Sequence, residues 1–436
     1  MNVSQMNALL LQGEIDHEGL WPRITEYEAK AAAFRFEFGL DKLPTEPGLI
    51  VVRGARQYGK STWLDLSLRD SIATFGKGSG FYLNGDDITN ADDLELRLLE
   101  VEALFAKSAG VRRIFVDEIT AVEGWEKAFK RLWDRGHLRN VLVVTTGSKA
   151  ADLRHGSERL PGRKGKLGRT DYLFLPVSFS QFNKIAHAKF GEKTWIAYLL
   201  TGGSPVLCND IYENGCLSES SIQLIRDWIL GDLVSSGRNR VFALNIMQSL
   251  FRFGGSPVGY AKLARESGLA NNTVAAGYIE RLSDLLSILP AWQWDSGRKL
   301  LMAQKPCKFN FINLAVAVAF HPNALRMNDD FQGLEPGQRG AWTEWLVAQE
   351  IFRRTALSGH DPERTGFWKS KEHEIDFVTA EGHLIEVKSG TAGPLDFGWF
   401  RKVFPKDQLT VVCKTPFETD HVRGITAEEF LLKGWS

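Results

Sequence analysis

The sequence is poor in cysteine and lacks both long apolar runs and an excess of charge of one sign. Its four cysteines form no C-x-x-C pair, which argues against a disulfide framework and a zinc site and is typical of reduced thiols in a cytoplasmic protein. The longest nearly apolar runs, such as residues 312–320, are far shorter than the roughly 18 to 20 residues that cross a bilayer, so we expect no membrane partner. The first residues have neither a basic start nor a small-residue cleavage site, so we expect no secretion signal.

The charge is balanced, with 53 basic and 53 acidic side chains. This balance excludes the uniform positive field of a histone-like binder, so any contact with nucleic acid must come from a local patch. Hydrophobic residues make up 44% of the chain and charged residues 24%, which excludes wholesale disorder. At roughly 100 to 200 residues per domain, a chain of 436 residues is expected to form two to four folding units.

Short apolar or β-branched runs alternate with helical patterns in the first part of the chain. The runs are LIVVR (49–53), FYLN (81–84), IFVDE (114–118), VLVVTT (141–146) and YLFL (172–175). Between them, apolar residues recur at intervals of three and four, as in residues 61–75 and 91–109. A repeated strand, helix, strand order is typical of a mostly parallel sheet with helices on both faces. We therefore predict a doubly wound α/β fold here.

The remaining patterns divide the chain further. A mainly helical region follows the predicted sheet, then a helix-turn-helix pattern, then a helix and several strand-like segments that predict a separate α/β domain. The predicted division is an N-terminal helical extension (1–48), an α/β core (49–178), a helical lid (179–240), a helix-turn-helix or winged-helix-like region (241–325) and a C-terminal α/β domain (326–436).

A glycine-rich segment, GARQYGKS at residues 54–61, lies between the first predicted strand and a predicted helix. It fits the phosphate-binding pattern G-x-x-x-x-G-K-[S/T] in the context that this motif requires. The glycines let the backbone curl, so that several N–H groups and the helix N-terminus face one anion. Lys60 would reach the β- and γ-phosphates of ATP, and the hydroxyl of Ser61 would bind Mg²⁺. The nucleotide-binding residues predicted in this segment are Gly54, Gln57, Tyr58, Gly59, Lys60, Ser61 and Thr62.

An acidic pair ends the third predicted strand. Asp117 and Glu118 follow the apolar run of residues 114–116, which places two carboxylates at the sheet edge where ligands bind. Asp117 would hold Mg²⁺, and Glu118 would orient or activate the attacking water. Alone, such a pair is as often a solvated strand end. Together with the phosphate loop it predicts a site for ATP and Mg²⁺.

Polar and basic residues follow the fourth predicted strand. Ser148 in the segment TTGS (145–148) would sense the γ-phosphate, although a turn with a helix cap is the alternative. Residues 154–169 carry six Arg or Lys against one Glu, a composition that is usually a solvated loop. One of these arginines could act on the phosphates bound by a neighbouring subunit, and we favour Arg163 over Arg159. That role would require a homo-oligomer.

These segments together resemble the core of AAA+ ATPases that carry a C-terminal domain of poorly defined function. The resemblance is dense from about residue 49 to 210 and looser beyond it. It implies nucleotide binding by the phosphate loop, hydrolysis through Asp117 and Glu118, and a role in defence or mobile-element biology. The chain departs from the family pattern at Thr120, Lys149 and Asn313. The segments that carry the resemblance are GARQYGKSTWLDL, IFVDEITAVEGWEKAFKRLWDRG, VVTTGSKAADL, LPGR and FLPVSFSQF.

A second set of carboxylates lies near the C-terminus. Asp376 and the triplet Glu386-Val387-Lys388 sit on successive predicted strands, and alternate residues of a strand share a side. Two carboxylates, Asp376 and Glu386, would bind Mg²⁺ while Lys388 stabilises developing phosphate charge. This pattern resembles the restriction-endonuclease-like PD-(D/E)xK fold, in which a preceding helix often supplies another acid. Glu344 fits that place best, with Glu350 as the alternative. A nuclease-like fold that has lost its chemistry is the competing interpretation.

The helix-turn-helix pattern at residues 256–290 is weak as a DNA reader. Its second helix offers only Arg281 as a base, whereas major-groove readers usually need several basic or amide contacts. Asn271 and Asn272 could touch bases, but we favour a role in packing or subunit contact.

The leading hypothesis is a Mg²⁺-dependent ATPase coupled to a nuclease-like domain that acts on or binds nucleic acid, DNA in preference to RNA. The alternative is a nucleotide-dependent switch that binds a protein partner, with an inert nuclease-like tail.

Overall fold

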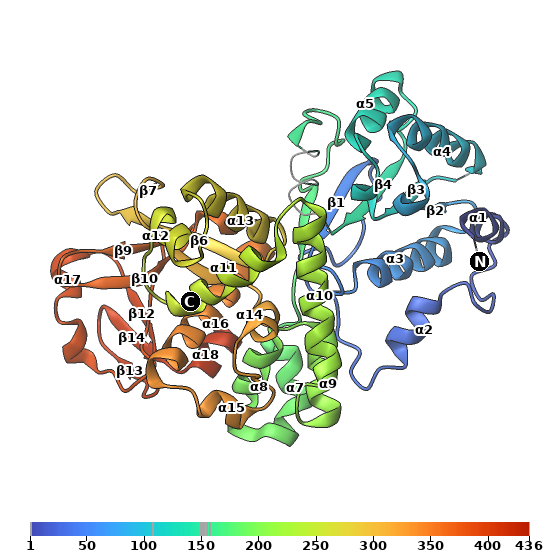
Figure 1. The fold of residues 1–436 in the computed structure, drawn as a ribbon. Coiled ribbons are helices and arrows are strands. Elements are labelled where there is room, and N and C mark those ends of the chain that lie inside the picture. Colours follow the sequence, from blue (N-terminus) through green and yellow to red (C-terminus); the bar gives the residue numbers. More distant parts are fainter. Residues whose placement is uncertain (1, 107–108, 149–152, 154–155, 157, 436) are drawn as a thin grey trace. The chain divides into compact units, whose positions relative to one another are not determined.

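The computed structural model describes all residues except 1, 107–108, 149–152, 154–155, 157 and 436. Lys149, one of the departures from the family pattern, therefore lies outside the described residues. The chain forms two compact units, Met1–Leu175 and Pro176–Ser436 (Figure 1). No helix in the described part of the chain is long and apolar enough to cross a membrane.

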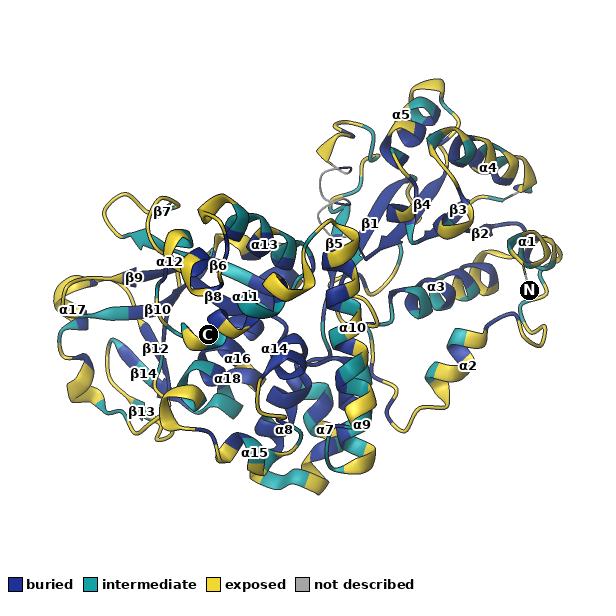
Figure 2. Ribbon diagram, viewed as in Figure 1, coloured by how far each residue is buried: buried dark blue, intermediate teal, exposed yellow. Residues whose placement is uncertain are grey.

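The first unit is built on a parallel sheet, as predicted from the alternating pattern. Within the described residues its strand order is β2-β3-β4-β1-β5, and each neighbouring pair is parallel. Figure 2 shows these strands as largely buried, which explains why they read as continuous apolar runs. The strands are β1 (Gly48–Gly54), β2 (Gly80–Asn84), β3 (Arg113–Asp117), β4 (Leu142–Gly147) and β5 (Asp171–Phe174).

Helices cover both faces of this sheet. On one face, apolar side chains of α4 and α5 form a core cluster with alternate strand residues such as Val51, Ile114 and Val143. On the other face, α3 packs against β2, β3 and β4. The helices of this unit are α1 (Val3–Gln12), α2 (Pro22–Glu28), α3 (Lys60–Phe75), α4 (Ala91–Leu104) and α5 (Trp125–Arg135), with short 3₁₀ turns η1 (Gly85–Asp87) and η2 (Ile119–Ala121).

The N-terminal helix α1 protects the edge of the sheet. The side chain of Asn7 on α1 donates to the carbonyl of Tyr82 at 2.8 Å and accepts from the Tyr82 N–H at 2.9 Å. Tyr82 belongs to β2, which is the edge strand in the described sheet. The amide therefore satisfies backbone groups that a free strand edge would leave unpaired.

The second unit begins with helices and ends with strands. The longest of its described helices, α16, is buried along most of its length. The helices are α7 (Phe179–Phe190), α8 (Thr194–Thr201), α9 (Pro205–Asn214), α10 (Glu219–Ser235), α11 (Arg240–Arg252), α12 (Tyr260–Glu266), α13 (Asn272–Asp284), α14 (Leu314–Phe320), α15 (Asn328–Gln332), α16 (Pro336–Leu357), α17 (Phe400–Val403) and α18 (Ala427–Lys433), with short 3₁₀ turns η3 (Gly191–Lys193), η4 (Pro362–Arg364) and η5 (Pro394–Phe397).

A mixed sheet joins two segments that the sequence patterns treat as separate. Its order over the described residues is β13-β14-β12-β11-β10-β9-β6-β7, and β8 also pairs with β6. Strand β6 lies in the segment predicted to be winged-helix-like, yet it pairs in parallel with β9, Trp292 opposite Gly366. The strands are β6 (Ile288–Asp295), β7 (Leu300–Met302), β8 (Lys308–Phe311), β9 (Gly366–Lys369), β10 (Glu374–Val378), β11 (Leu384–Val387), β12 (Leu409–Val412), β13 (Phe417–Glu418) and β14 (Val422–Ile425).

Helices α12 and α13 occupy the helix-turn-helix segment. The side chain of Asn271 caps α13 by accepting from the Val274 N–H at 3.0 Å, so this amide is engaged in its own helix. The buried side of α13 carries Tyr278, Ile279 and Leu282, which are packed in the unit.

Candidate functional site

The strand order of the first unit brings three predicted motifs to one sheet edge. Strands β3, β4 and β1 are neighbours and run in parallel, so their carboxyl ends lie side by side. The phosphate loop follows β1, Asp117 ends β3, and Thr146 lies near the end of β4. This edge is where open α/β sheets bind ligands.

The loop between β1 and α3 is shaped to receive an anion. Gln57 (φ 62°) and Gly59 (φ 99°) are left-handed, and α3 begins directly after Gly59. A Cβ at Gly59 would lie 2.8 Å from the ring of Phe36, and one at Gly54 would lie 2.7 Å from Cβ of Phe174. Both glycines are therefore required by close packing, and the turn presents backbone N–H groups and a helix N-terminus to one point. Tyr58 is buried, whereas Gln57 is exposed.

Lys60 is folded back over this loop. Its ammonium donates to the carbonyls of Gly54 at 2.9 Å and Ala55 at 2.7 Å, and the residue is only 6% exposed. Burial lowers the pKa of the Lys60 ammonium to about 8, although the charges of Glu118 and Asp117 act in the opposite direction. The carbonyls are weaker partners for a cation than phosphate oxygens, so the ammonium is held ready to move to an anion.

The lowered pKa of Lys60 predicts a pH-dependent affinity for ATP. Above pH 8 the ammonium of the nucleotide-free protein loses its proton, and phosphate binding must restore it. ATP affinity should then fall as the pH rises from about 8 towards the ordinary value of 10.5, by up to about tenfold per pH unit, with uptake of up to one proton. Calorimetry in buffers of different ionisation enthalpy measures this uptake. Lys60→Arg should show no such uptake, because a guanidinium stays charged. If the parent protein took up the same number of protons on binding ATP at every pH from 6.5 to 9.5, the lowered pKa of Lys60 would be contradicted.

Ser61 and Asp117 have the chemistry of a Mg²⁺ site. The Ser61 hydroxyl lies 3.1 Å from Oδ1 of Asp117, and Thr146 donates to the same oxygen. A hydroxyl and a carboxylate are oxygen ligands of the kind that Mg²⁺ prefers. The residues present at this point therefore fit Mg²⁺. Thr62 follows in the first turn of α3 and is partly exposed.

Two residues that the sequence patterns did not single out also contact Asp117. Oδ2 of Asp117 accepts from the Arg23 guanidinium at 3.1 Å and from the Tyr82 hydroxyl at 3.4 Å. Arg23 comes from α2 in the N-terminal extension and also lies 3.5 Å from Asp65. Burial raises the pKa of Asp65 to about 7, with Arg23 acting in the opposite direction and Asp117 in the same one. No local spacing links Arg23 to the loop, so only the folded chain identifies it.

Glu118 is held by hydroxyl groups at the same edge. Its Oε1 accepts from Thr120 at 2.7 Å and from the N–H and hydroxyl of Ser148 at 3.0 and 2.8 Å. Burial opposes ionisation of Glu118, but these hydrogen bonds and the charge of Lys60 outweigh it, so its pKa lies below the ordinary value. Glu118 is thus an ionised carboxylate, and Ser148 contacts this carboxylate in the described arrangement.

Residues 46–183 match a family model described as an AAA domain. This match supports an AAA-type ATPase domain in that segment, which we call the AAA domain. It contains the phosphate loop, Asp117, Glu118 and Ser148, but not Arg23. The match spans about a third of the chain, so it describes this segment and not the C-terminal half.

Solved structures of three archaeal proteins resemble the chain at 13–14% identity. A Walker-type ATPase of Pyrococcus abyssi has 14% identity and a TM-score of 0.43, covering 62% of this chain and 90% of that one. The ORC2 protein of Aeropyrum pernix has 13% identity and a TM-score of 0.35, with 71% and 94% covered. Cdc6p of Pyrobaculum aerophilum has 14% identity and a TM-score of 0.26, with 63% and 88% covered. These TM-scores are low, so the nucleotide site rests on the AAA match and its own geometry. No curated protein matches the sequence of this chain.

The two arginines considered for action in a neighbouring subunit are paired within their own unit. Arg163 binds Asp134 through Nε at 2.7 Å, and Arg159 binds Glu126 at 2.8 Å. The side chains of Arg163 and Asp134 are 27% and 48% exposed, so their ion pair lies at the surface and can exchange for another anion.

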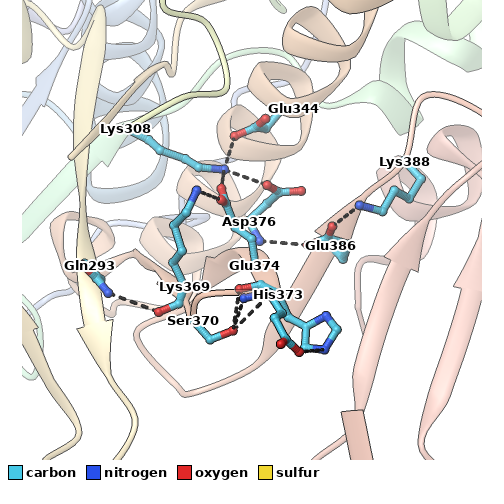
Figure 3. A network of polar contacts seen from close by, with 11 residues as sticks. Gln293, Lys308, Glu344, Lys369, Ser370, His373, Glu374, Asp376, Glu386 and Lys388 are labelled. Atoms are coloured by element: carbon cyan, nitrogen blue, oxygen red, sulfur yellow. Dashed lines mark hydrogen bonds and ion pairs between the residues drawn. The ribbon is translucent and has the colours of Figure 1, made fainter. Parts of the chain in front are cut away.

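The second unit gathers the predicted C-terminal residues (Figure 3). Strands β10 and β11 pair Phe377 with Ile385, and the Asp376 N–H donates to Glu386 at 3.1 Å. Lys388 forms an ion pair with Glu386. Glu344 on α16 reaches the same cluster, whereas Glu350 is bound by Arg353 and Arg354 at 2.7 and 2.6 Å.

Lys308 is the cluster member that the sequence patterns missed. It opens β8, and its ammonium lies 2.7 Å from Asp376 and 3.1 Å from Glu344. Burial raises the pKa of Glu344 to about 7 and that of Glu386 to about 8, and the charge of Asp376 adds to both shifts. The strand KFNF alternates polar and apolar residues, as a half-exposed strand does, so the local sequence gives no signal that Lys308 is buried.

Proposed function

We propose that this chain is a Mg²⁺-dependent ATPase whose catalytic centre is the phosphate loop of the AAA domain. The observation that carries the proposal is the convergence of Lys60, Ser61, Asp117 and Glu118 at the carboxyl edge of one parallel sheet. Phosphoryl transfer to water needs a loop that binds phosphate at a helix N-terminus, a cation, oxygen ligands for a metal ion and an ionised carboxylate. Lys60, Ser61, Asp117 and Glu118 supply the last three.

Each of these residues has a definite part in the proposed reaction. Lys60 leaves the carbonyls of Gly54 and Ala55 and donates to β- and γ-phosphate oxygens, while the loop N–H groups hold the remaining charge. Ser61 and Asp117 would hold Mg²⁺, which neutralises phosphate charge when bound. Glu118 exchanges its hydrogen bonds with Ser148 and Thr120 for one to the attacking water.

The proposed assembly is a homo-oligomer in which Arg163, or Arg159 in its place, reaches a nucleotide bound by a neighbouring copy. An exposed ion pair contributes little free energy, so Arg163 can leave Asp134 for a phosphate.

The proposed domains are the N-terminal extension (1–48), the core (49–178), the lid (179–240), the winged-helix-like region (241–325) and the nuclease-like domain (326–436). The nuclease-like segment is proposed to bind nucleic acid, DNA in preference to RNA.

A second candidate is a nucleotide-dependent switch for a protein partner, with a nuclease-like tail that does not cut. The observation that favours it is the ammonium of Lys308 among the carboxylates where a nuclease would hold metal. In that case ATP binding and hydrolysis would control the partner alone.

ATP turnover measured with Mg²⁺, alone and with single- or double-stranded DNA or RNA, tests both candidates. Turnover that nucleic acid raises severalfold supports the first, and turnover that nucleic acid leaves unchanged supports the second. A protein that hydrolyses no ATP under any of these conditions would contradict both. Gels of the same reactions report strand cleavage independently.

A further inference from the structure

The C-terminal carboxylates surround a buried lysine. The Lys308 side chain is 1% exposed, and its ammonium lies 2.7 Å from Asp376, 2.7 Å from Glu374 and 3.1 Å from Glu344. Figure 3 shows Lys308 directed between Glu344 on α16 and Asp376 on β10. An ammonium has three N–H donors, so these three carboxylates can satisfy all of them. The ring of Phe367 lies 5.6 Å from the nitrogen and closes another side.

The two carboxylates expected to bind metal each accept hydrogen bonds from this chain at both oxygens. Asp376 accepts from Lys308 through Oδ1 and from the Val387 N–H through Oδ2 at 2.9 Å. Glu386 accepts from Lys388 through Oε1 and from the Asp376 N–H through Oε2 at 3.1 Å. Every carboxylate oxygen of this pair therefore already has a protein donor.

Charge leads to the same result. Glu374 is also paired with Lys369 at 2.6 Å. Three lysines, at 308, 369 and 388, therefore face four carboxylates, at 344, 374, 376 and 386, and leave at most one negative charge unbalanced. A divalent ion binds where carboxylate charge is not yet balanced, because attraction to that charge offsets the free energy that the ion loses on dehydration. The residues at this point do not fit Mg²⁺, because a buried ammonium lies among the carboxylates. Asp117 differs, since its Oδ1 faces the hydroxyls of Ser61 and Thr146 and its cationic partner Arg23 is 42% exposed.

We propose that Lys308 is the resident cation of the C-terminal domain, occupying the place of the divalent metal in a nuclease-like carboxylate cluster. Its ammonium links β8, β10 and α16, and the cluster stays closed to Mg²⁺ while Lys308 is present. The cluster therefore does not support metal-assisted phosphodiester cleavage. This inference goes beyond ATP hydrolysis and holds whether or not the AAA domain turns over nucleotide.

Removing the ammonium should turn the cluster into a metal site. In Lys308→Ala, the carboxylates lose their cation and gain room for a hydrated ion. We expect this variant to bind one Mn²⁺ per chain at least tenfold more tightly than the parent protein, as measured by electron paramagnetic resonance of free Mn²⁺ on nucleotide-free protein. Asp117→Asn in both proteins removes the metal ligand of the AAA domain from the comparison. Mn²⁺ should also raise the melting temperature of the alanine variant and not that of its parent.

Two control variants separate the lost charge from its position. Lys402→Ala removes an exposed lysine of α17, outside the cluster, and should leave Mn²⁺ binding unchanged. Lys308→Met removes the charge but fills the space, so it should melt lower than the parent and bind Mn²⁺ less well than Lys308→Ala. A folded Lys308→Ala protein that takes up no Mn²⁺ would overturn the proposal.

The parent protein gives a test that does not depend on how the lysine variants fold. If Lys308 is the resident cation, Asp376→Asn should leave the weak Mn²⁺ binding of the parent unchanged. Tight binding of one Mn²⁺ by the parent, lost in Asp376→Asn, would show that metal displaces Lys308 and would overturn the proposal. Both readouts are independent of ATP turnover, so failure of the proposed ATPase activity would be seen separately.

Discussion

Replacing Lys60 with alanine is expected to lower the affinity for ATP about 100-fold. The ammonium is buried against the carbonyls of Gly54 and Ala55, within the loop. A hydrogen bond to a charged group contributes roughly 1.5 to 3 kcal/mol, and about 2.7 kcal/mol corresponds to that factor. Binding of labelled ATP measured over micromolar to millimolar concentrations reports the loss.

The control for this substitution is Lys127→Ala on α5, because Lys127 is an exposed lysine in the same unit. It should bind ATP like the parent. Circular dichroism and thermal melting show whether the Lys60 variant keeps its fold. Unchanged ATP affinity in a folded Lys60→Ala protein would mean that the loop is not the nucleotide site, and the proposed function would then fail.

Replacing Glu118 with glutamine should separate binding from hydrolysis. The amide oxygen of glutamine can still accept from Thr120 and Ser148, so the local structure is kept, but glutamine cannot take a proton from water. General-base catalysis typically contributes a factor of about 10² to 10⁴, and we expect turnover to fall by at least about 100-fold. ATP affinity should stay within about threefold of the parent.

Phosphate release in single-turnover experiments measures this effect without interference from product release. Glu123→Gln changes an exposed glutamate in the same loop region and should leave turnover unchanged. Normal turnover by the Glu118 variant would reassign the base to another group. In that case, the ionised state of Glu118 would serve only to position Ser148 and Thr120.

The proposed nucleotide site is largely predictable because its parts are local. A phosphate loop needs glycines, a lysine and a hydroxyl within eight consecutive positions, between a strand and a helix. The parallel sheet then follows from the alternation of strands and helices, and it brings Asp117 to the loop because both lie at carboxyl strand ends. Arg23 could be identified only from the folded chain, because no sequence motif links α2 to Asp117.

The C-terminal cluster is predictable only in part. The register of β10 and β11 places Asp376 across from Glu386, as expected from the spacing of two strands around a tight turn. Lys308 comes from β8, in a segment predicted to be a different domain. Strand β8 pairs with β6, and β6 pairs in parallel with β9. Parallel pairing between strands far apart in the sequence leaves no local signature.

By itself, the amino-acid sequence determined the parallel sheet, the phosphate loop and the acidic residues of both clusters, because short-range hydrophobic periodicity and motif spacing encode them. Only the tertiary structure decided which cations meet those acids: Arg23 at Asp117, and Lys308 between Glu344 and Asp376. The physical reason is that a charge balance depends on distances of a few ångströms between side chains far apart in the chain. Folding sets those distances, and residue order alone does not.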